Sequence, residues 1–118
     1  MITTHVLDIA AGRPGKAIAI DLERHSRDID DDSAEDHWHP VGSGTTDDDG
    51  RLRTLTPAGP VAPGVYRIRF HTGAYFASQG SHGFFPVVEI QFTVADGAQH
   101  YHVPLLLSPY GYSTYRGS

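Results

Sequence analysis

Eight histidines and a complete lack of cysteine limit the chemistry that this chain can do. Without cysteine there is no disulfide, no thiolate ligand for zinc and no thiol nucleophile. Imidazole, in contrast, can accept or donate a proton near neutral pH. His5 lies near the start of the chain, and His100 and His102 lie near its end. All three are in strand-like segments, and they are the first candidates for acid–base work.

Two histidine pairs and one acidic run could suggest a metal site. "HWH" at 37–39 and "HYH" at 100–102 place two imidazoles on one strand face, as some zinc and copper sites do. Neither motif brings a carboxylate partner. The run Arg27 to Asp36 starts like a calcium loop, but Ser33 replaces the required glycine and His39 the required glutamate. We therefore predict a solvated surface loop, no metal and no other cofactor.

The segments that would position these side chains have a period of two. Apolar residues alternate with polar ones in "AIAIDLE" at 17–23, "VYRIRFHT" at 65–72 and "VVEIQFTV" at 87–94. Such alternation indicates strands that are buried on one face. Only Ala74 to Gln79 could form a short helix. Turn signals separate the strands, at 12–15, 47–50, 57–64 and 95–97. At 118 residues we expect a single domain, 1–118, folded as an all-β sandwich of seven or eight short strands.

Two predicted strands carry apolar residues on both faces. They are "ITTHVLDI" at 2–9 and "HYHVPLLL" at 100–107. A strand that is apolar on both faces needs cover on both. A sandwich of this size has only one interior, so we expect a second copy of the chain to cover the other face. The histidines would then line a subunit interface that is half apolar and half ionisable, a typical place for a site.

The charge of the chain argues against several partners. Its formal net charge is −5, with a sequence pI near 5.8, and it has no basic stripe of the kind that binds nucleic acid. No segment approaches the ~20 apolar residues that span a bilayer. "MITTHVLDIAAGRPG" lacks the basic and apolar regions of a signal peptide. We expect a cytoplasmic protein that binds neither nucleic acid nor membrane.

Two long motifs, in the right order and at the right separation, resemble the signatures of the transthyretin-like family. They are "HVLDIAAGRP" near the start and "YHVPLLLSPYGYSTYRGS" at the end, and "GSGTTDDDGRL" and "FFPVVEIQF" extend the likeness between them. The family holds hormone carriers and a hydrolase of 5-hydroxyisourate. Four features mark the hydrolase branch, and this chain has them all: His5, Arg51, His102 and the terminal "YRGS", Tyr115 to Ser118.

The resemblance implies a fold, an assembly and an activity. The fold is a transthyretin-like (prealbumin-like) sandwich of two four-stranded sheets with one short helix. The assembly is a homotetramer, a dimer of dimers, with sites in the clefts between dimers. The activity is metal-independent hydrolysis of 5-hydroxyisourate, a product of urate oxidation, to an imidazoline carboxylate. The alternative is a carrier of small aromatic molecules that uses the same cleft, but two histidines and an arginine around a polar hole favour a hydrolase.

The resemblance also supplies roles for individual residues. Ring opening needs water to attack a carbonyl, so either His102 or His5 would activate the water, with the Ser118 hydroxyl relaying or orienting the proton. Arg51 would clamp the substrate and offset the charge of the oxyanion, because its guanidinium is a permanent, planar donor. We expect the chain terminus to pack against the strand of His102 and its last residues to line the cleft. The expected substrate-binding residues are His5, Arg51, Tyr115 and Arg116.

Overall fold

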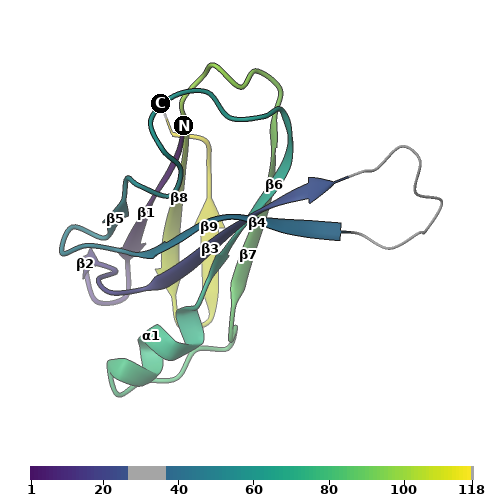
Figure 1. The fold of residues 1–118 in the computed structure, drawn as a ribbon. Coiled ribbons are helices and arrows are strands. Elements are labelled where there is room, and N and C mark those ends of the chain that lie inside the picture. Colours follow the sequence, from purple (N-terminus) through teal and green to yellow (C-terminus); the bar gives the residue numbers. More distant parts are fainter. Residues whose placement is uncertain (27–36, 118) are drawn as a thin grey trace.

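The computed structural model describes residues 1–26 and 37–117. The acidic run Arg27 to Asp36 and the proposed catalytic Ser118 therefore lie outside the described residues. The elements follow one another along the chain as strands with one helix (Figure 1). They are β1 (Ile2–Asp8), β2 (Arg13–Pro14), β3 (Ala19–Ser26), β4 (His37–Thr45), β5 (Arg51–Leu52), β6 (Gly64–Phe70), α1 (Thr72–Ser78), β7 (Val88–Val94), β8 (Tyr101–Ser108) and β9 (Gly111–Thr114).

The strands form two sheets, which confirms the predicted all-β sandwich. One sheet has the order β2-β1-β8-β9, with β5 also pairing with β1, and the other has the order β4-β3-β6-β7 (Figure 1). The first sheet thus has five strands where four were expected, and the described chain has nine strands where seven or eight were expected. The difference comes from β2 and β5, which are two residues long and too short to show a period of two.

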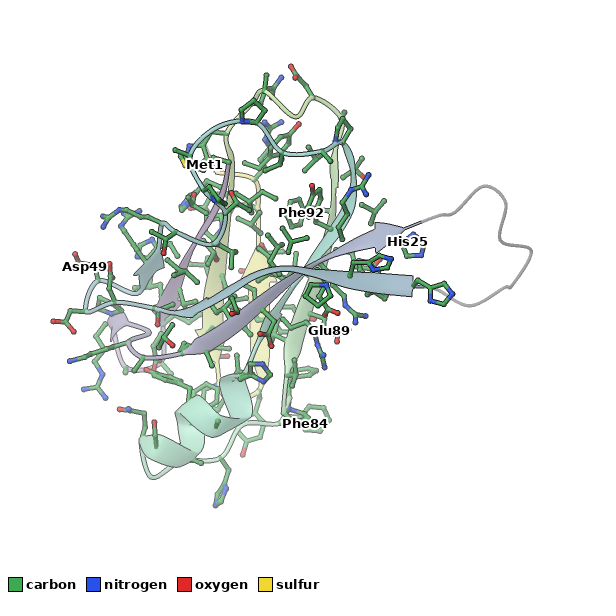
Figure 2. The ribbon with its side chains drawn as sticks, viewed as in Figure 1. Met1, His25, Asp49, Phe84, Glu89 and Phe92 are labelled. Carbon is green, nitrogen blue, oxygen red and sulfur yellow. The ribbon has the colours of Figure 1, made fainter. Side chains whose placement is uncertain are left out.

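The core lies between the sheets and is built from the alternating residues that the sequence predicts (Figure 2). On β6, for example, the burial alternates residue by residue from Tyr66 to Phe70. Burial of apolar surface stabilises the sandwich by about 25 cal/mol per Å². Phe92 of β7 is partly exposed and stacks on Tyr66, with ring centroids 6.0 Å apart. The largest fully buried side chains are Tyr66, Phe70, Ile2, Ile18, Ile20, Leu22, Leu55, Ile68, Leu105, Leu107, Val6 and Val88.

The predicted short helix is present and begins two residues earlier than expected, at Thr72. It is held to β1 by a buried hydrogen bond, in which the Tyr75 hydroxyl donates to Asp8 Oδ2 at 2.7 Å. Burial, together with the neighbouring carboxylate, raises the pKa of Tyr75 to about 12. The hydroxyl therefore stays protonated and keeps this bond at physiological pH. Within residues 1–26 and 37–117, no helix has the length and apolar character needed to cross a bilayer.

Strands β1 and β8 come from opposite ends of the sequence and lie side by side as a parallel pair (Figure 1). Thr3 lies opposite His102, and His5 lies opposite Pro104. Because the chain alternates faces along a strand, Thr3, His5 and His102 point to the outer face of this sheet. Further along that face, Leu7 and Leu106 stay half-exposed in the single chain. The outer face of this sheet is therefore polar around Thr3 and His102 and apolar around Leu7 and Leu106.

Candidate active site

The turn at Asp47–Gly50 sets the position of Arg51. The Asp47 carboxylate accepts the backbone N–H groups of Asp49 and Arg51, each at 2.9 Å. The bond from Arg51 is the main cause that lowers the pKa of Asp47. Gly50 has φ +76°, and a Cβ there would collide with the carbonyl oxygen of Val6. Only glycine meets both conditions, and it allows β5 to start directly against β1.

His5 is held by the same turn. It lies opposite Arg51 in the pairing of β1 with β5, and its Nε2 is 3.0 Å from the carbonyl oxygen of Asp49. A carbonyl oxygen can only accept, so we assign the proton of the ring to Nε2. In the neutral ring, the lone pair is then on Nδ1. The turn thus fixes the backbone of Arg51 and also selects the tautomer of the His5 ring.

His102 and His100 both contact one hydroxyl group. Thr3 Oγ1 lies 2.8 Å from His102 Nδ1 and 2.7 Å from His100 Nε2. His102 is half-buried, and this burial lowers its pKa by disfavouring the charged ring. The positive charge of Arg51 lowers the pKa further, and a proton on His100 or His5 would act in the same direction. His102 is therefore neutral at pH 7 and can accept a proton, as a general base must.

A surface pocket of about 320 Å³ opens over these groups. Its lining includes Thr3, Arg51, Arg53, His100 and His102, and no carboxylate is among the described side chains that line it. Its two guanidinium groups make the pocket electropositive. Such a pocket suits a planar, polar molecule that carries or develops negative charge.

The chain terminus packs against the strand of His102, as the sequence predicts. Strand β9 pairs with β8, and the Gly117 N–H donates to the His102 carbonyl oxygen at 2.8 Å. A Cβ on Gly117 would come within 2.7 Å of Cδ2 of the His102 ring. Glycine is therefore required for this approach. Since Nδ1 faces Thr3 and Cδ2 faces Gly117, the ring is held on two sides and Nε2 is the nitrogen left for a ligand.

Tyr115 and Arg116 lie apart from the pocket beside His102 in the single chain. The Arg116 guanidinium donates to Gln99 Oε1 at 2.7 Å and stacks over the Tyr101 ring at 4.5 Å. Tyr115 is 57% exposed. Both residues line a second, more apolar hollow of about 240 Å³, between β7 and the pair β8–β9. The structure therefore brings together His5, Arg51 and His102, and the role of Tyr115 and Arg116 in substrate binding stays a prediction.

Thr3, like Arg53, is a residue of this site that the sequence motifs do not reveal. The available signal is its position two residues before His5, which places both on one strand face. The "HYH" rings both contact Thr3, and their centroids are 6.3 Å apart.

Over the part of the chain that the structure describes, no three histidine or acidic side chains are grouped as metal ligands.

Comparisons with known proteins show the family and the fold of this chain. The model of the HIUase/Transthyretin family matches residues 2–117. A 5-hydroxyisourate hydrolase of Salmonella dublin is 42% identical over 118 residues, which cover 100% of this chain and 81% of that protein. The structure of Klebsiella pneumoniae 5-hydroxyisourate hydrolase has a TM-score of 0.81 at 32% identity and covers 99% of this chain and 97% of its own. Sea bream transthyretin in complex with thyroxine has a TM-score of 0.85 at 32% identity, covering 98% and 93%.

Proposed function

This chain belongs to the HIUase/Transthyretin family, and we propose that it is a 5-hydroxyisourate hydrolase of urate catabolism. The observation that carries the proposal is the grouping of His5, Arg51 and His102 on one sheet face, around an electropositive pocket. The relatives from Salmonella dublin and Klebsiella pneumoniae, which bear the name of this hydrolase, support the choice of the enzyme over the carrier.

The mechanism assigns one role to each of the three side chains. His102, whose pKa is lowered, takes a proton from water through Nε2 while the water oxygen attacks the ring carbonyl. Arg51 offsets the negative charge that develops on the carbonyl oxygen. His5, with its Nε2–H committed to Asp49, presents Nδ1 to the site and orients the substrate. Of the two candidate bases, the lowered pKa favours His102.

Three further parts of this proposal concern the rest of the site. The reaction proceeds without a metal, with imidazole alone activating the water. The protein is a homotetramer, because the half-exposed Leu7 and Leu106 need cover and adjoin the polar end of the same face. Ser118, Tyr115 and Arg116 complete the site once the copies assemble. The cytoplasmic location expected from the sequence stays a prediction.

The test is to generate 5-hydroxyisourate from urate in situ and follow its ultraviolet decay with and without the protein. We expect a large acceleration that Arg51→Gln reduces by about 100- to 1,000-fold in kcat/KM. Arg13→Gln is the matched control, since Arg13 is an exposed arginine bound to Gln79, away from the pocket. Tight binding of a small aromatic molecule without any change in the decay would indicate the carrier instead.

A further inference from the structure

The Thr3 hydroxyl lies between two imidazole nitrogens and has a single proton to share. Its oxygen is 2.7 Å from His100 Nε2 and 2.8 Å from His102 Nδ1. A hydroxyl donates one hydrogen bond and accepts up to two. At least one of the two rings must therefore donate its own N–H to Thr3. The protonation states of His100 and His102 are coupled through this oxygen.

Two arrangements place the hydroxyl proton between the rings. In the first, His102 donates from Nδ1 to Thr3, which donates to His100 Nε2, so the lone pair of His102 is on Nε2. In the second, every bond is reversed, and neutral His102 carries its proton on Nε2. The first arrangement presents a base to the pocket and the second presents an acid. Transfer of the His102 Nδ1 proton to Thr3, and of the Thr3 proton to His100 Nε2, reverses every bond. It follows the gain of a proton at His102 Nε2 and leaves the positive charge on His100.

We propose that Thr3 and His100 form a proton relay behind His102, which lets this one imidazole act first as base and then as acid. The inference rests on the proposed hydrolase function and deepens it. Thr3 and His100 are positioning residues in this scheme, since they act on the substrate only through His102. Thr3 lines the pocket but is only 4% exposed, so its hydroxyl has little contact with bulk water.

The protons balance over the two steps. In the attack, the water oxygen bonds to the ring carbon, the carbonyl π pair moves to oxygen, and the water proton goes to His102 Nε2. The Nδ1 proton of His102 then moves to the Thr3 oxygen as the Thr3 proton moves to His100 Nε2, which leaves the positive charge on His100. In the second step, Nε2 gives its proton to the leaving nitrogen as the C–N bond breaks, and both relay protons return.

The charges around the site give the relay its advantage. An imidazolium at His102 would be half-buried beside Arg51 and His5, which is why the pKa of that ring is lowered. His100 is exposed to water, so a positive charge there keeps its hydration. Moving the charge one ring outward therefore lowers the energy of the intermediate. The titratable and charged groups that line the pocket are Arg51, Arg53, His100, His102 and Met1 with its amine, and His5 lies near enough to His102 to affect its pKa.

The first test removes the Thr3 hydroxyl and keeps the shape of the side chain. Thr3→Val should lower kcat by about 10- to 100-fold with little change in KM, and Thr3→Ser, which restores the hydroxyl, should recover most of the rate. Thr72→Val is the matched control, because Thr72 is also fully buried but its hydroxyl donates to the carbonyl oxygen of Phe85, in a different part of the fold. It should lower stability and leave kcat unchanged.

The second test keeps the hydrogen bond but stops proton uptake. The amide of His100→Gln can still pair with Thr3, but it cannot hold an extra proton. This variant should lower kcat and lose part of the pH dependence of kcat. In His100→Ala, added imidazole buffer should restore part of the lost rate, because a free base can take the place of the missing ring. Full kcat in Thr3→Val and His100→Gln would overturn the relay.

The tautomer of His102 gives a readout that needs no substrate. Nitrogen NMR of the protein with ¹⁵N-labelled histidine should find the His102 proton on Nδ1 in the native chain and on Nε2 in a large fraction of Thr3→Val. A proton found on Nε2 in the native chain would overturn the relay. If the native chain fails to accelerate the decay of 5-hydroxyisourate, the hydrolase proposal itself falls, whereas an active chain with a fully active Thr3→Val variant removes only the relay.

Discussion

Replacing Gly50 with alanine tests how the turn positions the site. The left-handed backbone, with φ +76°, costs an ordinary residue about 1–2 kcal/mol. The new Cβ would also push against the Val6 carbonyl oxygen and weaken the hydrogen bond from the Val6 N–H to the Gly50 carbonyl oxygen, at present 2.8 Å. Losing that bond adds about 1 kcal/mol. The expected destabilisation is about 2–3 kcal/mol, or roughly 6–15 °C in Tm for a chain of this size.

The same change should damage activity, because Arg51 follows Gly50 directly and the His5 ring is bonded to the same turn. A shift of about 1 Å in a positioning group can cost 100-fold in rate. Gly12→Ala is the matched control. Gly12 has nearly the same φ, +69°, but no atom lies within 4 Å of the position of its Cβ. That variant should lose only the backbone term of about 1–2 kcal/mol and keep kcat/KM.

The two measurements are thermal unfolding by circular dichroism and the decay of 5-hydroxyisourate. We expect Gly50→Ala to fall below Gly12→Ala in both. Equal melting temperatures for the two variants would show that the contact with Val6 carries no energy. An unchanged kcat/KM in folded Gly50→Ala would show that the turn does not position Arg51, and the account of the site given above would be wrong.

Three other predictions concern pH, metal and the chain terminus. The acid limb of kcat/KM should lie below pH 6.5, the ordinary pKa of histidine, because the pKa of His102 is lowered and the base works only when neutral. By the same linkage, the contribution of His102 to stability is complete above pH 6.5 and is lost as the pH falls through the lowered pKa, which acid titration of the melting temperature can check. Treatment with a chelator should leave the rate unchanged, and a loss restored by zinc would contradict metal-independent hydrolysis. Deleting Tyr115 to Ser118 should reduce kcat by more than about 100-fold. Tm should fall by only a few degrees, because the described part of the segment contributes one backbone bond to His102, worth about 1 kcal/mol, and the surface contacts of Arg116 with Gln99 and Tyr101. A truncated chain with near-native turnover would refute this role.

The sandwich was predictable from the sequence because its long strands bury one face each. The alternation of "VYRIRF" and "VVEIQF" follows directly from the period of a strand, and β6 and β7 lie where it predicts them. The short strands β2 and β5 were not predictable, since pairing along two residues depends on the tertiary position of β1 and leaves no pattern of its own. The sequence predicts the helix but not its first two residues, because Thr72 and Gly73 are poor helix formers.

The grouping of three candidate residues was predictable, whereas their catalytic roles stay a prediction and the hydrogen bonds around them could not be foreseen. His5, Arg51 and His102 follow from the family motifs, and the pairing of strands explains why they meet. The contact of Thr3 with two histidines could not be foreseen, because it depends on the parallel register of β1 with β8. Arg116 shows the opposite case. Its motif suggested the site, yet in the single chain its guanidinium stacks on Tyr101 and donates to Gln99.

The parallel pairing of β1 with β8 also bears on when activity can first arise during synthesis and folding. Thr3 and His102 are 99 residues apart in sequence, so the hydrogen bond between them closes almost the longest loop that this chain can form. Contacts between residues so far apart in sequence form late and slowly, because the entropy of closing the loop must be lost before the contact is gained. On the ribosome, β1 leaves the exit tunnel long before its partner has been translated, and it has to wait with an unpaired edge. Catalytic activity should therefore appear with the slowest phase of folding. The time at which turnover begins would report when the last strands dock.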